Sequence, residues 1–528
     1  MENLFLKEMR QGAGSAYTAN GAISYASVGS VLADQFGKAG SARNRELADV
    51  FTDQTNLWNE NNLSGLTFPF YLRMITRKTH LFNDNLTDKV QMGQGAKDES
   101  FKRLLWLAYY QPDTFYKNLW LLPLIGSWKD LWVLMYMDNS NYLNRNKFYE
   151  LIAEGINDPY HSNLIKKYLP RIRSNKKCST DWAKKTNQFA KEFISFVGWT
   201  AKEYRIFKSS GTAHTFQQYM CHGLYDKLNF NCIPGRALFN LSKNNGEFFN
   251  RHNLYDKYIT WIKNQPTVKF TGYVYELVKQ VKYNTSLLQK LTLDKQFDGL
   301  IELAKKDNNR ISENVWVLLD TSGSMSCTIP GTDITCSNIA NSLAVYFATL
   351  NQGAFHKSVL AFDSTSKLYN LSGSFTEMLS NLPYVGCGGT NFQGAIDEII
   401  RVRKNNPNIP LSDYPKVLIA VSDMQFNPAG NNFETNYMLM KKNLYSEFPK
   451  DFVDDMKFIW WHVCARYKDF PSTIDHPGTY NISGFDGSII NLLLGTDANT
   501  SENTNTHSSI EEIISKALSQ EVLLQLTL

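Results

Sequence analysis

The sequence predicts a mainly α-helical repeat structure followed by a doubly wound α/β structure, and two observations predict this order. From about residue 56 to residue 306 the apolar residues recur mostly at intervals of three and four, the spacing of amphipathic helices. After Asn309 short apolar runs alternate with amphipathic stretches, as buried parallel strands alternate with their connecting helices. Because 528 residues are too many for one hydrophobic core, we expect two domains, residues 1–308 and residues 309–528.

The composition is that of a folded protein without a membrane segment. Hydrophobic residues make up 43% of the chain and charged residues 20%, with more aromatic residues than a disordered chain carries. The first residues carry acid where a secretory signal carries base, and no apolar run reaches the length of a membrane-spanning helix. The seven cysteines form no CxxC pair. We therefore expect a cytoplasmic protein with free thiols and no contact with a membrane.

The first part of the chain begins with a segment rich in Gly, Ala, Ser and Asn, from Gly12 to Gly40, which we expect to be irregular before a first helix near Val31–Phe36. Further along, Gly, Pro and Asn separate the helical stretches every 15 to 25 residues or so. Pairs of helices that stack on their neighbours have such spacing, although no strict sequence repeat is present.

The second part contains four predicted strands, within residues 315–320, 358–363, 416–423 and 456–463. Amphipathic stretches at 337–350, 391–403 and 433–444 are predicted helices between them. The repeated order of strand and helix predicts a parallel sheet, in which ligands bind at the carboxyl ends of the strands.

Oxygen-bearing side chains gather where these strands end. Asp320 begins the pattern Asp-x-Ser-x-Ser, a second carboxylate ends the run at 416–423, and a threonine follows two glycines before the helix at 391–403. Carboxylates and hydroxyls are the hard ligands that magnesium prefers. The sequence predicts a site for Mg²⁺ or another divalent cation, formed by Asp320, Ser322, Ser324, Thr390 and Asp423.

Two simpler interpretations stand beside the metal site. The pattern Asp-x-Ser-x-Ser also occurs in turns and at helix N-termini, where Asp and Ser are favoured without any ion. Asp363 ends a predicted strand as well, and either supports the metal ligands from outside or is a turn residue.

With Asp320-Thr-Ser-Gly-Ser324, Gly388-Gly-Thr390 and Ser422-Asp423 in this order, roughly the last 210 residues resemble a von Willebrand factor A domain with a metal-ion-dependent adhesion site. In that family the two serines usually coordinate the ion directly, the threonine does so in some states, and the aspartates often act through water. An open position on the ion accepts a carboxylate from a partner. The resemblance implies a protein-docking module, and we expect no enzymatic activity.

The helical part is basic and the second part is acidic. Residues 1–310 hold 42 Lys and Arg against 28 Asp and Glu, whereas residues 311–528 hold 13 against 22. The segment from Lys166 to Lys208 contains twelve basic residues and only three acidic ones. Four aromatic residues lie among them, Trp182, Trp199, Tyr204 and Phe207. Basic residues neutralise phosphates and aromatic rings stack on unpaired bases, which favours RNA over duplex DNA. The predicted RNA-binding residues are Lys166, Lys167, Arg171, Arg173, Lys176, Lys177, Lys184, Lys185, Lys202, Arg205 and Lys208.

The simpler interpretation of this cluster is a solvated helix face with its aromatic residues in the core. A family resemblance favours RNA. The phrases that carry it are Thr18–Ala22, Met92–Glu99, Leu122–Leu131, Glu203–Phe207 with Met220, and Cys232–Ala237, followed by the adhesion-site domain. Their order is similar to that in the TROVE proteins, the Ro autoantigen family. The resemblance implies HEAT-like helical repeats closed into a ring that binds small structured or single-stranded RNA.

These observations leave three functional hypotheses. The first is a ribonucleoprotein subunit that holds RNA on its helical part and docks a protein partner through the metal ion. The second is an assembly or structural protein, of a phage or virus for example, that binds partners through the metal site and no RNA. The third is an adaptor for an ATPase, since some adhesion-site domains work with such motors.

Overall fold

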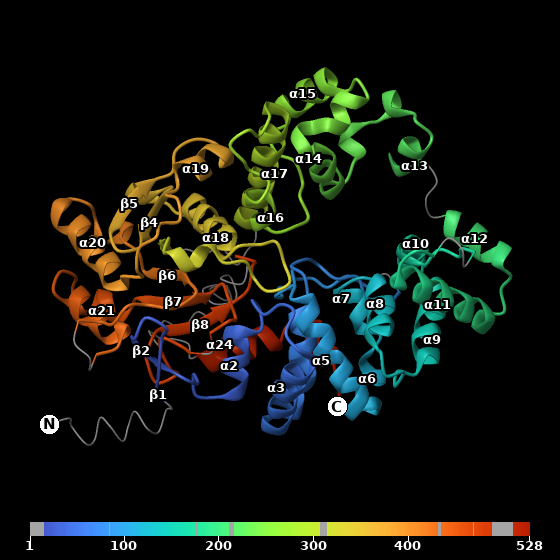
Figure 1. Cartoon of the computed structure of the whole chain (residues 1–528), viewed down its shortest axis with the longest axis horizontal. Coiled ribbons are helices and arrows are strands. Elements are labelled where there is room, and N and C mark those ends of the chain that lie inside the picture. The colour runs from blue at the N-terminus through green and yellow to red at the C-terminus, as the bar shows by residue number, and fades with distance from the viewer. Residues whose placement is uncertain are drawn as a thin grey trace. The chain divides into compact units, whose positions relative to one another are not determined.

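The computed structural model describes residues 15–83, 85–174, 178–210, 216–306, 314–430, 434–467, 469–487 and 510–528, and Figure 1 labels their elements. The chain forms two compact units. Met1–Asn44 and Ile233–Lys516 belong to the first unit, and Arg45–Cys232 and Ala517–Leu528 belong to the second. This division does not follow the boundary expected at residue 309. A separate domain of residues 309–528 stays a prediction.

The first unit contains a six-stranded mixed sheet in the order β5-β4-β3-β6-β7-β8. Neighbouring strands are parallel except for the edge strand β5, which pairs antiparallel with β4. The four predicted strands are confirmed as β3, β4, β6 and β7, and β5 and β8 are additional. The strands are β3 Val315–Asp320, β4 Ser358–Phe362, β5 Ser366–Asn370, β6 Val417–Ser422, β7 Lys457–His462 and β8 Thr479–Ser483.

Helices cover both faces of this sheet. Side chains alternate between the faces of a strand, so the adjacent residues Trp460 and Trp461 of β7 point in opposite directions. Trp460 packs against Phe392 of α20, with ring centroids 5.1 Å apart, and Trp461 packs against Phe347 of α18, with centroids 6.1 Å apart. The helices around the sheet are α2 Val31–Lys38, α18 Cys336–Leu350, α19 Phe375–Asn381, α20 Phe392–Asn405, α21 Asn436–Tyr445, α22 Lys450–Asp454 and α24 Ile510–Leu518.

The rest of the first unit consists of a small hairpin and four helices. The hairpin pairs β1 with β2 antiparallel, and α2 after it contacts β8. The helices precede the sheet in the chain, and α17 contacts α19 while α16 contacts α18. Their bounds are β1 Ser15–Tyr17, β2 Ile23–Tyr25, α14 Gly235–Arg251, α15 Tyr255–Lys263, α16 Val274–Val278 and α17 Leu287–Lys306.

The second unit is helical, as the apolar spacing predicts. Its core includes the ion pair of Arg103 with Glu99, whose side chains are fully buried 2.9 Å apart. The C-terminal residues return to this unit, where the side chain of Gln520 bonds both the N–H and the carbonyl of Met92. The helices are α3 Leu47–Glu60, α4 Asn62–Arg73, α5 Lys97–Tyr110, α6 Pro112–Asn118, α7 Leu121–Ile125, α8 Lys129–Met137, α9 Arg145–Ile156, α10 Pro159–Tyr168, α11 Asp181–Val197, α12 Ala201–Ser210 and α13 Phe216–Cys221.

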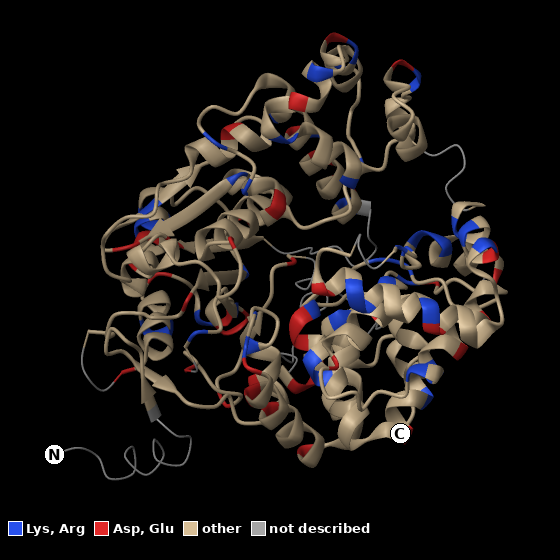
Figure 2. Ribbon diagram, turned by 45° about the vertical axis from the view of Figure 1, so that its right-hand side comes forward, with Lys and Arg blue, Asp and Glu red and all other residues tan. Residues whose placement is uncertain are grey.

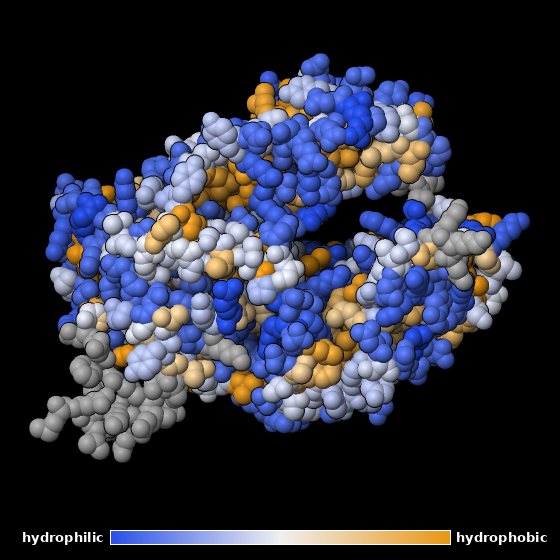
Figure 3. Space-filling view, in the orientation of Figure 1, coloured by the Kyte–Doolittle hydropathy of each residue, from blue (hydrophilic) through white to orange (hydrophobic). Residues whose placement is uncertain are grey.

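One face of the molecule is mostly polar. On the face seen in Figure 3, hydrophilic residues predominate and hydrophobic residues lie in smaller patches between them. Within the described part of the chain, every helix is too short or too polar to cross a membrane.

Candidate metal site

Asp320 is the last residue of β3, and its carboxylate is buried with only 1% of the residue exposed. One oxygen, Oδ1, accepts the N–H of Ser322 at 2.8 Å, and the other, Oδ2, accepts the hydroxyl of Ser422 at 2.5 Å. Burial raises the pKa of Asp320 to about 6, against the hydrogen bonds from Ser322 and Ser422, and the charge of Asp423 raises it further. A buried carboxylate beside a second one is stabilised by a nearby cation.

The two serines of the motif lie beside this carboxylate. The hydroxyls of Ser322 and Ser324 are 3.2 Å apart. Ser322 stands before the short 3₁₀ helix η4, Gly323–Ser326, but its side chain makes no capping hydrogen bond to that helix. The turn interpretation therefore accounts for the bond from the Ser322 N–H to Asp320, while the hydroxyl of Ser322 does not act as a helix cap.

Asp423 follows β6, the neighbour of β3 in the sheet, and is also buried. Burial raises the pKa of its carboxyl, against the hydroxyl of Ser324, the N–H of Gln425 and the charge of Arg466, while the charge of Asp469 raises it further. Ser324 thus hydrogen-bonds the second carboxylate. A chain of polar contacts runs from Asp320 through both serines to Asp423.

The residue after Asp423 has a strained backbone. Met424 is buried and has φ +65°, a left-handed conformation that a bulky side chain rarely adopts. Such a residue costs about 1–3 kcal/mol and persists only where its surroundings hold it. The N–H of Met424 donates to the hydroxyl of Ser422 at 2.9 Å, so Ser422 holds both Asp320 and this turn.

Thr390 lies in the loop before α20 and is 2% exposed. Its N–H donates to Asn427 Oδ1 at 3.3 Å, and its carbonyl accepts the N–H of Asn427 at 2.9 Å, which fixes it against the loop after β6. Neighbouring side chains pack closely against the two glycines before it. A Cβ on Gly388 would lie 2.5 Å from Ser364 Oγ, and one on Gly389 would lie 2.9 Å from Asn427 Nδ2.

Asp363 lies at the end of β4 in a turn. Its Oδ1 accepts the N–H of Thr365 at 2.8 Å and the hydroxyl of Thr365 at 3.2 Å. Its Oδ2 lies against the Gly386 backbone, 2.7 Å from where a Cβ would stand. The turn interpretation of Asp363 describes these contacts, and its carboxylate also borders the loop that carries Thr390.

Two buried carboxylates thus stand at the carboxyl ends of β3 and β6, with the hydroxyls of Ser322 and Ser324 beside Asp320, and the backbone of Thr390 is bonded to the loop that follows Asp423. Within the described residues no group of three or more His, Cys, Asp and Glu side chains is arranged to hold a metal ion. Any ion here would depend on hydroxyl ligands as well as carboxylates, a set of hard oxygen donors that suits Mg²⁺. The donor chemistry fits the predicted ion, and its binding stays a prediction. Sequence reasoning used Ser422 only as the neighbour of Asp423 and assigned it no role, and it missed Gln425, which has no motif of its own.

The predicted RNA-binding residues lie in the second unit, on α10, α11, α12 and the segment between α10 and α11 (Figure 2). Lys176 and Lys177 fall outside the described residues. Helix α11 begins where Thr180 caps it by accepting the N–H of Ala183 at 3.1 Å. The exposed members of the predicted set are Lys167, Arg171, Arg173, Lys184, Lys202 and Arg205.

Lys208, by contrast, is engaged within the fold. Its Nζ donates to the carbonyls of Lys166 and Leu169 at 3.2 and 2.5 Å. Desolvation, with the charge of Arg171, lowers its pKa to about 8. Lys185 bonds Asn139 Oδ1 at 3.2 Å and pairs with Asp181 at 3.8 Å. These two lysines have partners inside the protein.

The aromatic residues of the cluster pack against one another. Tyr204 is buried and donates its hydroxyl to the carbonyl of Pro170 at 2.7 Å, so it cannot stack on a base. The ring of Trp199 packs on Phe207 with centroids 5.1 Å apart, and that of Trp182 meets Tyr136 edge-on at 4.9 Å. The basic charge of the cluster is exposed in part, whereas its aromatic rings serve mainly to hold the helices together.

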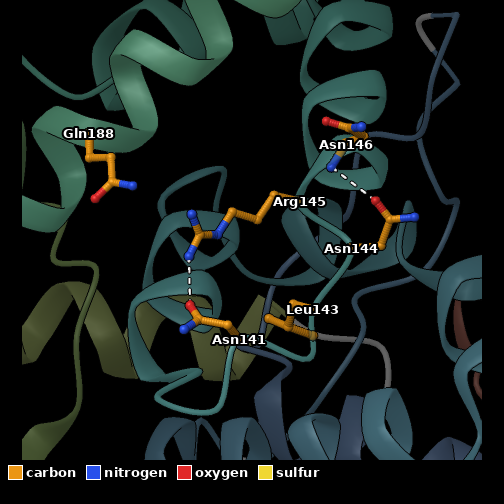
Figure 4. A pocket seen from close by; sticks show the side chains of 6 residues that line it. All are labelled: Asn141, Leu143, Asn144, Arg145, Asn146 and Gln188. Carbon is orange, nitrogen blue, oxygen red and sulfur yellow. Dashed lines mark hydrogen bonds between the residues drawn. The ribbon is translucent and has the colours of Figure 1, made fainter.

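A pocket of about 510 Å³ also lies in the second unit, at the start of α9 (Figure 4). It is lined by Asn141, Leu143, Asn144, Arg145, Asn146 and Gln188. Arg145 donates to Asn141 Oδ1 at 2.8 Å and to Glu192 Oε1 at 3.1 Å, so its charge is paired. The lining offers amide groups and no nucleophile.

The candidate site lies within a segment of the chain that matches a known family model. A family model with the description "Domain of unknown function (DUF7788)" matches residues 314–522, which include all five predicted metal ligands. No curated protein matches the chain. Among solved structures, the crystal structure of the Deinococcus radiodurans RO (RSR) protein is similar at 12% sequence identity and a TM-score of 0.38, over 80% of this chain and 87% of that chain. A similarity at that level says nothing about what this chain binds.

Proposed function

We propose that this protein binds a divalent cation, Mg²⁺ in the first place, and uses it to dock a partner protein. The observation that carries the proposal is the position of buried Asp320 and Asp423 at the carboxyl ends of β3 and β6, with the hydroxyls of Ser322 and Ser324 beside Asp320 and with Thr390 bonded to the loop that follows Asp423. The sheet order, with one antiparallel edge strand beside parallel strands, supports the resemblance to a von Willebrand factor A domain.

In this proposal Asp320, Ser322, Ser324, Thr390 and Asp423 hold the ion, directly or through water. When bound, the ion supplies an open coordination position that attracts a carboxylate of the partner. The protein's own groups provide the geometry. Ser422 holds Asp320, Asn427 holds Thr390, and the buried setting keeps competing water away from the carboxylates.

Isothermal calorimetry of Mg²⁺ and Mn²⁺ binding to the full chain, before and after treatment with EDTA, tests the metal site. We expect one ion per chain in the wild type and none in Asp320→Ala. A wild-type protein that takes up neither ion would overturn the proposal.

We further propose that the helical part binds RNA, small and structured or single-stranded. The exposed basic residues of α10 to α12 support this, together with the order of short phrases similar to that in TROVE proteins. A closed ring of helical repeats belongs to the same proposal. The test is a titration with labelled single-stranded RNA and a matched duplex DNA at two salt concentrations, after the protein has been stripped with high salt. Tight, salt-sensitive preference for RNA is the expected result.

The second candidate function is that of an assembly protein that uses the metal site and binds no RNA. The observation in its favour is the internal role of Lys208 and Tyr204, which leaves fewer groups for a nucleic acid than the sequence suggests. Absence of RNA binding at low salt, with metal-dependent capture of a protein, would favour this candidate. Both candidates are binding functions, and we propose no catalysis. His462 and Cys464, separated by one residue in sequence, are a histidine and a thiol that could in principle react together, but His462 is only 3% exposed.

A further inference from the structure

The N-terminal hairpin, residues 15–25, lies against the loop that follows β6 and carries Asp423. The hydroxyl of Thr18 donates to the carbonyl of Phe426 at 2.8 Å. The N–H of Ala19 donates to Gln425 Oε1 at 2.5 Å, and Asn20 Nδ2 donates to the carbonyl of Gln425 at 2.5 Å. Three successive residues of the hairpin thus bond two successive residues some 400 positions away in the sequence.

Gln425 connects this hairpin to Asp423. It is 3% exposed, and its own N–H donates to Asp423 Oδ1 at 3.3 Å. Its Nε2 donates to Asp469 Oδ1 at 3.3 Å. With the two bonds from the hairpin, the backbone and the side-chain amide of Gln425 are all engaged, so this residue has one orientation.

The strained turn at Met424 explains why such a connection is needed. Met424 lies between Asp423 and Gln425 in a left-handed conformation that its side chain does not favour. Ser422 holds this turn from one side through the bond to the Met424 N–H. The hairpin holds it from the other side through Gln425. The turn that follows Asp423 is thus held from both sides.

The second strand of the hairpin makes an independent attachment close by. The N–H of Tyr25 donates to the carbonyl of Phe470, and the N–H of Phe470 donates to the carbonyl of Tyr25, both at 2.8 Å. Phe470 follows Asp469, the carboxylate that receives the Gln425 side chain. The hairpin is therefore attached to both segments that hold Gln425.

We infer that the N-terminal hairpin is a part of the metal site, in which Thr18, Asn20 and Gln425 are positioning residues that hold Asp423 in place for the ion. The inference rests on the proposed metal site. It gives a role to the phrase Thr18-Ala-Asn-Gly-Ala22, whose glycine, Gly21, has φ +88° and so suits the tight turn between the strands.

The test compares Thr18→Val with Thr18→Ser in the full chain. Valine removes the hydroxyl that bonds Phe426 and serine keeps it. Calorimetry should show Mg²⁺ binding weaker in Thr18→Val by no more than about tenfold, the lower end of the range for loss of a residue that bonds a metal ligand directly, because Thr18 acts on Asp423 only through the loop at 424–426. Thr18→Ser should bind near wild type. The melting temperature in EDTA separates this effect from a general loss of stability.

Thr479→Val is the matched control. Thr479 is a buried threonine of the same unit, and its hydroxyl donates to the carbonyl of His476 at 2.8 Å. It begins β8, which is parallel to β7, so it lies at the amino ends of the strands and away from the site at their carboxyl ends. We expect this variant to bind Mg²⁺ as the wild type does. If Thr18→Val does not fold, Asn20→Ala decides, because it removes one exposed contact to Gln425 and should also weaken binding.

The outcomes separate this inference from the proposed function. Wild-type affinity in both Thr18→Val and Asn20→Ala, in a protein whose wild type binds Mg²⁺, would overturn the hairpin's role and leave the metal site standing. Equal losses in Thr18→Val and Thr479→Val would also overturn it. A wild type that binds no Mg²⁺ would overturn the metal site and the inference with it.

Discussion

The sheet edge of the first unit and the basic helices of the second unit place their predicted functional residues in opposite ways. At the sheet edge, Asp320 and Ser422 are 102 positions apart in sequence, yet Ser422 Oγ lies 2.5 Å from Asp320 Oδ2, and both residues are buried. On α10 to α12 the basic residues lie close together in sequence, and most of those described are exposed. A metal site depends on the position of each donor, whereas phosphate binding depends on the number of charges. One substitution should therefore disable the first region, while only several should disable the second.

The largest expected effect is that of Asp320→Ala. Loss of a carboxylate ligand should weaken Mg²⁺ binding by more than about 100-fold, beyond the range for residues that only orient a ligand. Metal-dependent partner binding should disappear with it, and RNA affinity should change little. Calorimetry and an RNA titration on one preparation measure both quantities.

Asp363→Ala is the control for that prediction, since Asp363 bonds Thr365 in a turn at the end of the next strand. It should retain Mg²⁺ binding within a few fold. Loss of both Mg²⁺ and RNA binding in Asp320→Ala would show that the two regions are coupled and do not act separately.

The next largest effect concerns the exposed basic residues. Replacement of Arg171, Arg173, Lys202 and Arg205 together by Glu should weaken binding of single-stranded RNA on the order of 100-fold at physiological salt, because phosphate contacts become repulsions. Mg²⁺ affinity should stay unchanged. Unaltered RNA affinity would mean that this face is only solvated surface. Circular dichroism of the variant controls for folding.

The pH dependence of stability should also distinguish the two units, through His462 at the end of β7. Burial lowers the pKa of His462 to about 3, against a hydrogen bond with Asn481. Because the folded pKa lies below the unfolded value near 6.5, the neutral form stabilises the fold at neutral pH. Below pH 6.5 this contribution falls by about 1.4 kcal/mol per pH unit.

Urea unfolding between pH 7 and pH 4.5 measures this slope. His462→Gln, which keeps a side-chain N–H to face Asn481 Oδ1, should flatten it. His222→Gln is the control, since His222 is exposed in the helical second unit. Identical slopes for the wild type and His462→Gln would exclude His462 as the source.

The smallest expected effect is that of one exposed lysine. Lys202→Ala should reduce the slope of log affinity for single-stranded RNA against log salt concentration by about 0.7, the value for one phosphate contact. The affinity should fall equally for unrelated RNA sequences. Lys191→Ala on α11, an exposed lysine outside the predicted set, is the comparison. A sequence-dependent loss in Lys202→Ala would indicate a base contact instead.

The strands predicted from the sequence were those whose apolar residues are continuous. β3, β4, β6 and β7 are buried throughout or nearly so, and runs such as Val315–Asp320 therefore stand out. The edge strand β5 is half-exposed, and β8 is buried although its residues, Thr479–Ser483, are mostly polar. Neither strand has the apolar pattern by which a strand is recognised in a sequence. β5 pairs at the edge of the sheet, and the polar residues of β8 make hydrogen bonds to their neighbours.

The positions of the proposed metal donors at strand ends could be predicted for a related reason. Asp320, Ser322 and Ser324 form a local motif, and strand ends in a parallel sheet meet at one edge, so their convergence with Asp423 follows from the order of the elements. The exposure of the basic cluster could not be predicted from the sequence in the same way. Lys208 and Tyr204 have the same local sequence pattern as their exposed neighbours. Only the packing of α12 against the segment after α10 buries Tyr204 and gives Lys208 its partners.

The sequence by itself determined which oxygen donors this protein carries and at which strand ends they stand, because those features depend on residue type and on the pattern of neighbouring residues. Only the tertiary structure decided how they are held. The bond from Thr18 to Phe426 spans 408 positions, and hydrogen bonds between segments so far apart leave no periodicity in the chain. The role inferred for the hairpin depends on packing, because only the tertiary structure places residues 18–25 against the loop after β6 and against Phe470.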